Sequence, residues 1–148
     1  MELMATSIRE IDNDDDLRAV WPVMVQLRPH LDREAFVDLC KIQFGEGFRL
    51  VAAFEGEACR ALAGFRILHY LHRGKNLYVD DLVTDAATRG RGYGKVLLNW
   101  LKAEARSEGC GNLHLDSGVQ RPEAHAFYFS QGLRIIGYHF AVDLGGSA

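Results

Sequence analysis

Hydrophobic positions in the first part of the chain predict a strand followed by two helices. Ser7–Ile11 predicts a short strand, and the aspartate-rich segment after it suits the start of a helix. Apolar residues at helical spacing predict a first helix over Leu17–Leu27 and a second over Ala35–Phe44, which Asp32 can cap. Pro22 predicts a kink in the first helix or a later start.

Extended apolar runs dominate the middle of the chain. Phe48–Phe54 and Ala58–Tyr70 have the composition of strands, and the Glu55-Gly56-Glu57 segment between them predicts a hairpin turn. Leu77–Thr84 predicts the next strand. Gly64 weakens the second strand of the hairpin, so it predicts a bulge or a close approach of backbone at that point.

Helices and strands alternate in the remainder of the chain. Val96–Ala105 has the strongest helical pattern, Leu113–Asp116 predicts a short strand, and Pro122 suits the first position of a helix that runs to Ser130. Arg134–Leu144 predicts a final long strand. The expected order is therefore β-α-α-β-β-β-α-β-α-β.

Composition limits the class of protein without naming a function. A chain of 148 residues is expected to form a single domain over residues 1–148. Its 48% hydrophobic and 25% charged residues are ordinary for a globular protein. The net charge of -3 and the scattered basic residues give no indication of a nucleic-acid partner.

Cysteine usage and the N-terminal sequence bear on the compartment. The three cysteines, Cys40, Cys59 and Cys110, are an odd number, which favours reduced thiols in the cytoplasm. Met1–Arg9 has no cationic segment followed by an apolar run, and no stretch approaches the roughly 20 apolar residues of a membrane span. We expect a cytoplasmic protein with no membrane partner, and no metal, because the histidines and cysteines lack metal-ligand spacing.

The glycine- and arginine-rich stretch Thr88–Lys95 indicates a ligand site. Its glycines permit positive φ and close approach of a ligand, and the helix that follows directs free N–H groups and the positive end of its dipole to the same place. Three side chains add positive charge there: Arg89, Arg91 and Lys95. Neither the Walker A nor the dinucleotide pattern fits, since Val96 follows Gly94-Lys95 and the last dinucleotide glycine is missing.

The pattern that does fit is [Gln/Arg]-x-x-Gly-x-[Gly/Ala], as Arg89-Gly90-Arg91-Gly92-Tyr93-Gly94. Here the sequence resembles the GNAT family of N-acetyltransferases, most specifically over Asn76–Leu144. The resemblance implies an α/β (α+β) GNAT fold, a central mixed, mostly antiparallel sheet with helices on both faces. It also implies that the loop, through Lys95, holds the pyrophosphate of acetyl-CoA as co-substrate. Backbone groups of the preceding strand would bind the pantetheine arm and the thioester carbonyl, at Leu82, Val83 and nearby Thr84.

Asp80 and Asp81 interrupt the apolar strand just before those residues. A carboxylate can attract a protonated amine and take its proton, directly or through water. Successive strand residues point to opposite faces, so each face is expected to receive one of the two. Asp81 resembles the acidic residue of aminoglycoside N-acetyltransferases and ranks ahead of Asp80. The alternative is a solvated face or a salt bridge to Arg66 or Lys75.

Tyr128 lies in a second family motif, Ala124-His125-Ala126-Phe127-Tyr128 followed by Gln131-Gly132-Leu133, with Leu133 where the family usually has Phe. The resemblance implies that this tyrosine protonates the leaving CoA thiolate, whereas a helical aromatic residue is otherwise more often part of a core. In the family the acceptor site is usually shaped by segments that correspond to Leu27–Asp32 and Tyr138–Phe140.

Together these residues predict an enzyme that transfers acetyl from acetyl-CoA directly to a primary amine of a small molecule or protein. The cysteines have no neighbouring histidine in sequence to suggest a nucleophile, so no covalent intermediate is expected. The alternative is a non-catalytic GNAT-like module that binds or senses acyl-CoA. An edge strand at the C-terminus would allow a homodimer.

Overall fold

The computed structural model describes residues 6–146, which form two compact units, one ending at Leu115 and one beginning at Asp116. The first unit is built on a five-stranded sheet in the order β1-β2-β3-β4-β5. The strands are β1 Thr6–Glu10, β2 Phe48–Glu55, β3 Ala58–Tyr70, β4 Gly74–Thr84 and β5 Asn112–Leu115. The first four are antiparallel neighbours and β5 runs parallel to β4, so the sheet is mixed and mostly antiparallel.

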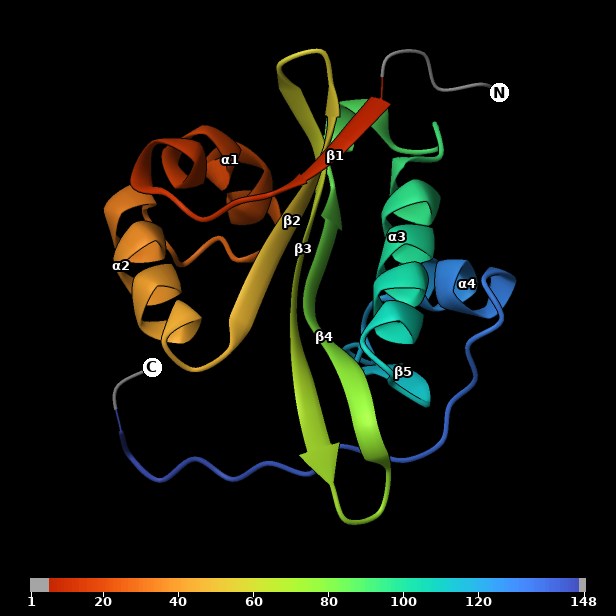
Figure 1. The fold of residues 1–148 in the computed structure, drawn as a ribbon. Coiled ribbons are helices and arrows are strands. Elements are labelled where there is room, and N and C mark those ends of the chain that lie inside the picture. The colour runs from red at the N-terminus through yellow and green to blue at the C-terminus, as the bar shows by residue number, and fades with distance from the viewer. Residues whose placement is uncertain (1–5, 147–148) are drawn as a thin grey trace. The chain divides into compact units, whose positions relative to one another are not determined.

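Helices cover both faces of this sheet. Helix α1, Asp14–Leu27, and helix α2, Arg33–Phe44, pack on one face, and α3, Tyr93–Ser107, packs on the other (Figure 1). A short 3₁₀ turn, η1 Ala86–Thr88, leads from β4 towards α3. The predicted fold class and the order of elements as far as α3 and β5 are therefore confirmed.

Side-chain caps set where the first two helices begin. The Asn13 side chain accepts a hydrogen bond from the Asp16 N–H at 2.9 Å, which starts α1 before the predicted Leu17. Pro22 lies inside that helix, so the later start that it suggested is not found. Asp32 caps α2 as predicted, its Oδ1 atom accepting from the Ala35 N–H at 2.8 Å.

The core between the sheet and α1 and α2 is apolar and fully buried. It joins side chains of both helices to those on one face of the strands: Leu17, Val20, Met24, Phe36, Val37, Leu50, Leu62 and Val83. On the opposite face α3 buries Tyr93, Leu97, Leu98, Leu101 and Ala105, whose spacing follows one side of a helix. The site described below lies at the edge of the first of these two cores.

A register shift in the β3–β4 ladder bends the middle of β4. Gly64 pairs with Asp81 and the next residue, Phe65, pairs with Val79, so Asp80 is an extra residue without a partner on β3. This is a β-bulge on β4. The prediction that Gly64 marks a bulge or a close approach is confirmed, since a Cβ atom there would lie 2.6 Å from Phe48 Cε1.

The second unit contains α4, Pro122–Ser130, which Pro122 opens as expected. The strand predicted over Arg134–Leu144 is wrong, because no strand is present in the described residues after Leu115. Its large apolar side chains are exposed instead: Ile135, Ile136, Tyr138, Phe140, Val142 and Leu144. The apolar content is that of a strand, but a strand also needs the edge of a neighbour to pair with, and the described part of this unit offers none.

Among the described residues no helix combines the length and apolar character needed to span a membrane.

Candidate active site

Both carboxylates of the Asp80-Asp81 pair lie on the face of the sheet that α1 and α2 cover. Asp81 Oδ2 is close to Phe48 and Gly64 on that face, and Asp80 pairs with Arg66 there. The expectation of one carboxylate on each face is therefore wrong. The reason is the bulge, because an extra residue in β4 cancels the alternation between Asp80 and Asp81.

Asp81 is held by an arginine from the segment that follows α1. Arg28 Nε donates to Asp81 Oδ1 at 2.9 Å, and Arg28 Nη2 donates to the Asp80 carbonyl at 3.0 Å. The Asp81 side chain is only 14% exposed. Burial raises the pKa of Asp81 above its ordinary value, while the charge of Arg28 and its hydrogen bond oppose the rise. Asp81 is thus a largely buried carboxylate with a raised pKa, as a general base requires.

Asp80 is bound on both oxygens by a different arginine. Arg66 Nε donates to Asp80 Oδ2 at 2.8 Å and Arg66 Nη2 to Oδ1 at 2.7 Å, a bidentate pair. The salt bridge to Arg66 that was the alternative for this residue is therefore present. Since both oxygens already accept strong hydrogen bonds, Asp80 is less suited than Asp81 to take a proton from a ligand.

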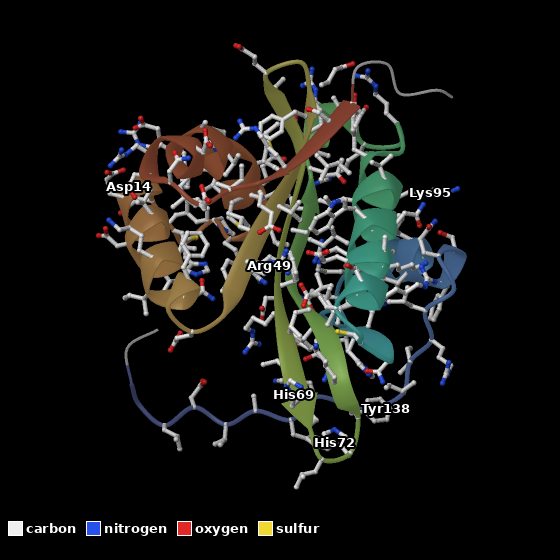
Figure 2. All side chains as sticks on the ribbon, in the orientation of Figure 1. Asp14, Arg49, His69, His72, Lys95 and Tyr138 are labelled. Atoms are coloured by element: carbon white, nitrogen blue, oxygen red, sulfur yellow. The ribbon has the colours of Figure 1, made fainter. Side chains whose placement is uncertain are left out.

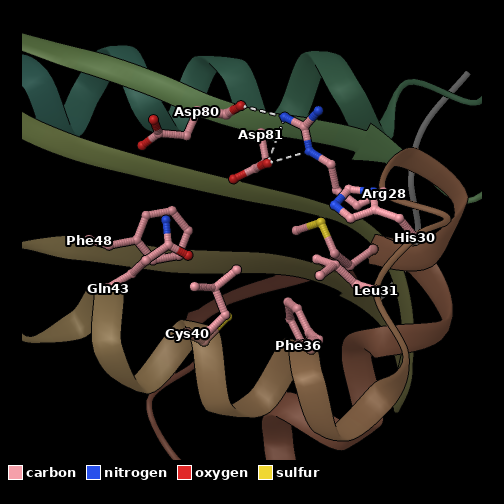
Figure 3. Close-up of a pocket in the computed structure, with 11 residues that line it drawn as sticks. Arg28, His30, Leu31, Phe36, Cys40, Gln43, Phe48, Asp80 and Asp81 are labelled. Carbon is pink, nitrogen blue, oxygen red and sulfur yellow. Dashed lines mark hydrogen bonds and ion pairs between the residues drawn. The ribbon is translucent and has the colours of Figure 1, made fainter. Parts of the chain in front are cut away.

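A cavity of about 380 Å³ opens beside Asp81, between β4 and the segment that joins α1 to α2 (Figure 3). Its walls come from α1, α2, their connection and three neighbouring strand residues: Met24, Arg28, His30, Leu31, Phe36, Leu39, Cys40, Gln43, Phe48, Asp80 and Asp81. The predicted acceptor segment Leu27–Asp32 thus supplies three lining residues. The lining combines apolar side chains with polar and charged ones, the mixture that lets a pocket bind and orient a small polar molecule.

Beyond the bulge, one edge of β4 has no neighbouring strand in the part of the chain that the structure describes. β5 pairs with β4 only from Asn76 to Val79, whereas β3 remains paired with β4 as far as Thr84. Within the described residues, the backbone of Leu82–Thr84 therefore faces no strand on the β5 side. The Val83 side chain is buried in the core, so any ligand contact at this position would be made by the backbone.

The glycine-rich loop links this edge to α3. Gly90 and Gly92 have φ of 81° and 91°, and Gly92 precedes the first helical residue, Tyr93. These are left-handed conformations that favour glycine. The hydrogen bond from the Val96 N–H to the Gly92 carbonyl, at 3.0 Å, opens the helix, so the N–H groups before Val96 point out of its N-terminus. That arrangement suits an anion.

The three cationic side chains of the loop are used differently. Arg91 Nη2 binds Glu55 Oε2 at 3.2 Å, and Glu55 also accepts from Arg60, whose hydrogen bond lowers the pKa of Glu55. Arg91 thus ties the loop to the end of β2. Arg89 and Lys95 are exposed, and Lys95 points away from the sheet (Figure 2). They carry the charge that a ligand can reach.

Tyr128 lies on α4 in the second unit. Its side chain is half-buried next to Phe127, with ring centroids 5.6 Å apart. Burial raises the pKa of the Tyr128 hydroxyl, and Arg121 works against the rise. The hydroxyl therefore stays protonated and able to donate well above neutral pH.

Cys40, which is buried, and Cys59, which is partly buried, are poor nucleophiles. Burial raises the pKa of Cys40 to about 12 and that of Cys59 to about 12, so both are protonated thiols near neutral pH. Cys40 lines the cavity, but in this state it contributes an apolar surface.

The sequence did not indicate that Arg28 is the ion-pair partner of Asp81. Arg28 lies in the segment Leu27–Asp32, which was expected to shape the acceptor site, but no single residue of that segment was predicted to act there. Arg28 and Asp81 are 53 positions apart in the sequence, and no local pattern predicts an ion pair between residues so far apart. Among the histidines, His30 lines the cavity, whereas His69 and His72 lie towards the far end of the β3–β4 hairpin (Figure 2).

Comparison with known proteins identifies relatives of this chain. Residues 8–133 match the family described as the acetyltransferase (GNAT) family. The chain is 36% identical over 137 residues to the uncharacterized N-acetyltransferase YhdJ of Bacillus subtilis, covering 90% of this chain and 95% of that protein. It is 27% identical over 134 residues to the aminoalkylphosphonate N-acetyltransferase of Salmonella typhimurium, covering 88% and 86% of the two chains.

Solved structures show the same fold. An aminoglycoside N-acetyltransferase crystallised in complex with CoA superposes with a TM-score of 0.75 at 18% identity, over 93% of this chain and 95% of that one. At that identity the likeness concerns the fold alone.

Proposed function

The chain belongs to the GNAT family of acetyltransferases, and on that premise we propose that it transfers the acetyl group of acetyl-CoA directly to a primary amine. The observation that carries this proposal is the position of Asp81. It lies at the wall of a small cavity, one residue before the unpaired edge of β4, and that edge leads to the glycine loop. A base, a row of free backbone groups and an anion-binding loop thus follow one another along a single segment.

The residues present fit acetyl-CoA. Gly90 has a positive φ, and a Cβ atom there would meet nothing within 4 Å, so the loop is open on that side. Its N–H groups and the exposed charges of Arg89 and Lys95 would bind the pyrophosphate. The backbone of Leu82–Thr84 would bind the pantetheine arm and, through an N–H group, the thioester oxygen. When bound, acetyl-CoA supplies an activated acyl group.

Each protein group has one task in the transfer. Asp81 attracts the ammonium form of the acceptor and takes its proton, so that the amine nitrogen can attack the carbonyl carbon. An N–H of Leu82 or Val83 stabilises the negative charge that develops on the oxygen, a contribution of about 3 kcal/mol in comparable sites. As the new C–N bond forms and the C–S bond breaks, Tyr128 donates its hydroxyl proton to the sulfur. The nitrogen then releases its second proton, which returns to Tyr128 through solvent and restores the hydroxyl.

The acceptor in this proposal is an amine of a small molecule or a protein. A relative named as an aminoalkylphosphonate N-acetyltransferase supports an amine of a small molecule. Two measurements test the proposal. Calorimetric titration with acetyl-CoA tests the co-substrate, and the absence of binding at millimolar concentration would reject it. Release of free thiol with a panel of amines tests the transfer, and binding without release would favour the non-catalytic module that senses acyl-CoA.

A further inference from the structure

The charges around the cavity are balanced. Asp81 is paired with Arg28 at 2.8 Å and Asp80 with Arg66 at 2.7 Å, so two carboxylates face two guanidinium groups. A ligand with only a positive charge would gain little from such a site, because each carboxylate already has a counter-ion. The two adjacent aspartates therefore do not make this a pocket for simple cations.

The charges are nevertheless separated within the cavity. Asp81 Oδ1 accepts from Arg28, whereas Oδ2 lies on the side of Phe48 and Gly64, and no donor to it is found among the described residues. On the other side, Arg28 and His30, two positions apart at the end of α1 and in the segment that joins it to α2, both line the cavity (Figure 3). Arg28 uses Nε and Nη2 in its bonds, while Nη1 has no partner in the described part of the chain. The Arg28 side chain is 40% exposed.

We propose that the acceptor is a small zwitterion, a primary amine that also carries a carboxylate or phosphonate a few atoms away. Its ammonium group binds Asp81 Oδ2, and its anionic group binds Arg28 Nη1 and the imidazole of His30. This inference rests on the proposed function, since it names the substrate class of the same cavity. It makes Arg28 and His30 specificity-determining residues, whereas Asp81 acts on the reacting nitrogen.

The size and lining of the cavity agree with this class of ligand. A volume of about 380 Å³ accommodates a short molecule rather than a folded partner. The lining also includes apolar side chains, among them Leu31, Phe36 and Cys40, which suit the methylene groups that would separate amine and anion. A protein lysine has no anionic group at this distance and would leave Arg28 Nη1 without a partner.

The test compares two probes by calorimetry in the presence of CoA: 3-aminopropanoate and its methyl ester, which differ in one negative charge. We expect the wild-type protein to bind 3-aminopropanoate about tenfold more tightly, the scale of one charge-assisted hydrogen bond at a partly exposed site. In the same way, 2-aminoethylphosphonate should bind more tightly than ethylamine. Both preferences should fall as salt rises, because the guanidinium is partly exposed.

Variants assign the preference to its residues. Arg28→Gln and His30→Ala should each bring the affinity ratio of acid to ester towards 1. Arg33→Gln is the matched control, since it removes a positive charge from the first turn of α2 at a position that does not line the cavity, and it should leave the ratio unchanged. Arg28→Lys should keep part of the preference.

A wild-type ratio near 1, a ratio that both variants leave unchanged, or no binding of either probe at millimolar concentration would each overturn the proposal. Because the titration needs no turnover, it separates the two claims. A preference for the acid without any thiol release would reject the proposed acetyl transfer and leave the ligand class standing. Thiol release together with equal affinity for acid and ester would support acetyl transfer and reject the zwitterionic ligand class.

Discussion

Gly64 on β3 lies directly opposite Asp81 on β4, and a Cβ atom at position 64 would stand 2.8 Å from Asp81 Oδ2 and 2.6 Å from Phe48 Cε1. The absence of a side chain at position 64 therefore leaves space for both the carboxylate and the aromatic ring. Gly64 also lies at the register shift between β3 and β4, where the bulge brings Asp80 and Asp81 to one face of the sheet.

Gly64→Ala is expected to destabilise the protein by about 1–3 kcal/mol, because the new methyl group overlaps a ring and a carboxylate that are already packed. Turnover should fall as well, since Asp81 must move. Chemical denaturation and thiol release measure the two effects.

A second substitution checks the cause of that loss. Phe48→Leu in the Gly64→Ala background removes the ring atoms that the methyl group meets, so the double variant should lose less stability than the sum of the single variants. Strictly additive losses would show that the contact with Phe48 is not the reason.

Arg28→Gln is expected to move the acidic limb of the pH profile of kcat/KM to higher pH. The base acts only when deprotonated, so activity is lost as the pH falls through the pKa of Asp81. Burial already raises that pKa, and Arg28 opposes the rise by its charge and hydrogen bond. Without Arg28 the pKa rises further. The profile should be recorded with ethylamine, which lacks the anionic group, and an unmoved limb would show that Asp81 does not control it.

The loop cations should differ in how they affect acetyl-CoA binding. Lys95→Ala and Arg89→Ala remove exposed charges, and each should weaken binding several-fold at low salt, with a smaller effect at high salt. Arg91→Ala should also lower thermal stability, because Arg91 binds Glu55 across the loop. Calorimetry and thermal denaturation together make the distinction. Equal effects of the three substitutions on both measurements would contradict it.

Tyr128→Phe is expected to lower kcat at least tenfold while the affinity for acetyl-CoA changes little, since the variant loses only a hydroxyl group. Burial raises the pKa of this hydroxyl, so the acid should remain protonated throughout the usual assay range. The comparison of kcat with calorimetric affinity checks the prediction. A variant that keeps full turnover would leave Tyr128 as a packing residue.

Local chemistry was enough to predict most of the fold. The caps and apolar spacing indicated the helices over Leu17–Leu27 and Ala35–Phe44, and Gly64 indicated the irregular point in the pairing of β3 with β4. The glycine loop was predictable for the same reason, because positive φ at Gly90 and Gly92 depends on those residues themselves.

Features that depend on pairing between distant segments were not predictable. Alternation placed Asp80 and Asp81 on opposite faces, but the register between β3 and β4 determines their side, and a register shift leaves no period in a single strand. Arg28 reaches Asp81 only after α1 packs on the sheet. The strand expected over Arg134–Leu144 is not formed. Apolar content alone does not show whether a neighbouring strand is available for pairing.

The most direct test of this account is amine-dependent release of thiol from acetyl-CoA by the wild-type protein and by Asp81→Asn. With 3-aminopropanoate or 2-aminoethylphosphonate as acceptor, we expect release by the wild type and at least about a hundredfold lower kcat/KM for the variant, the range of a lost general base. The affinity for acetyl-CoA should be unchanged. If acetyl-CoA binds but no amine in a broad panel releases thiol, or if Asp81→Asn releases thiol at the wild-type rate, the proposed role of Asp81 in acetyl transfer is wrong.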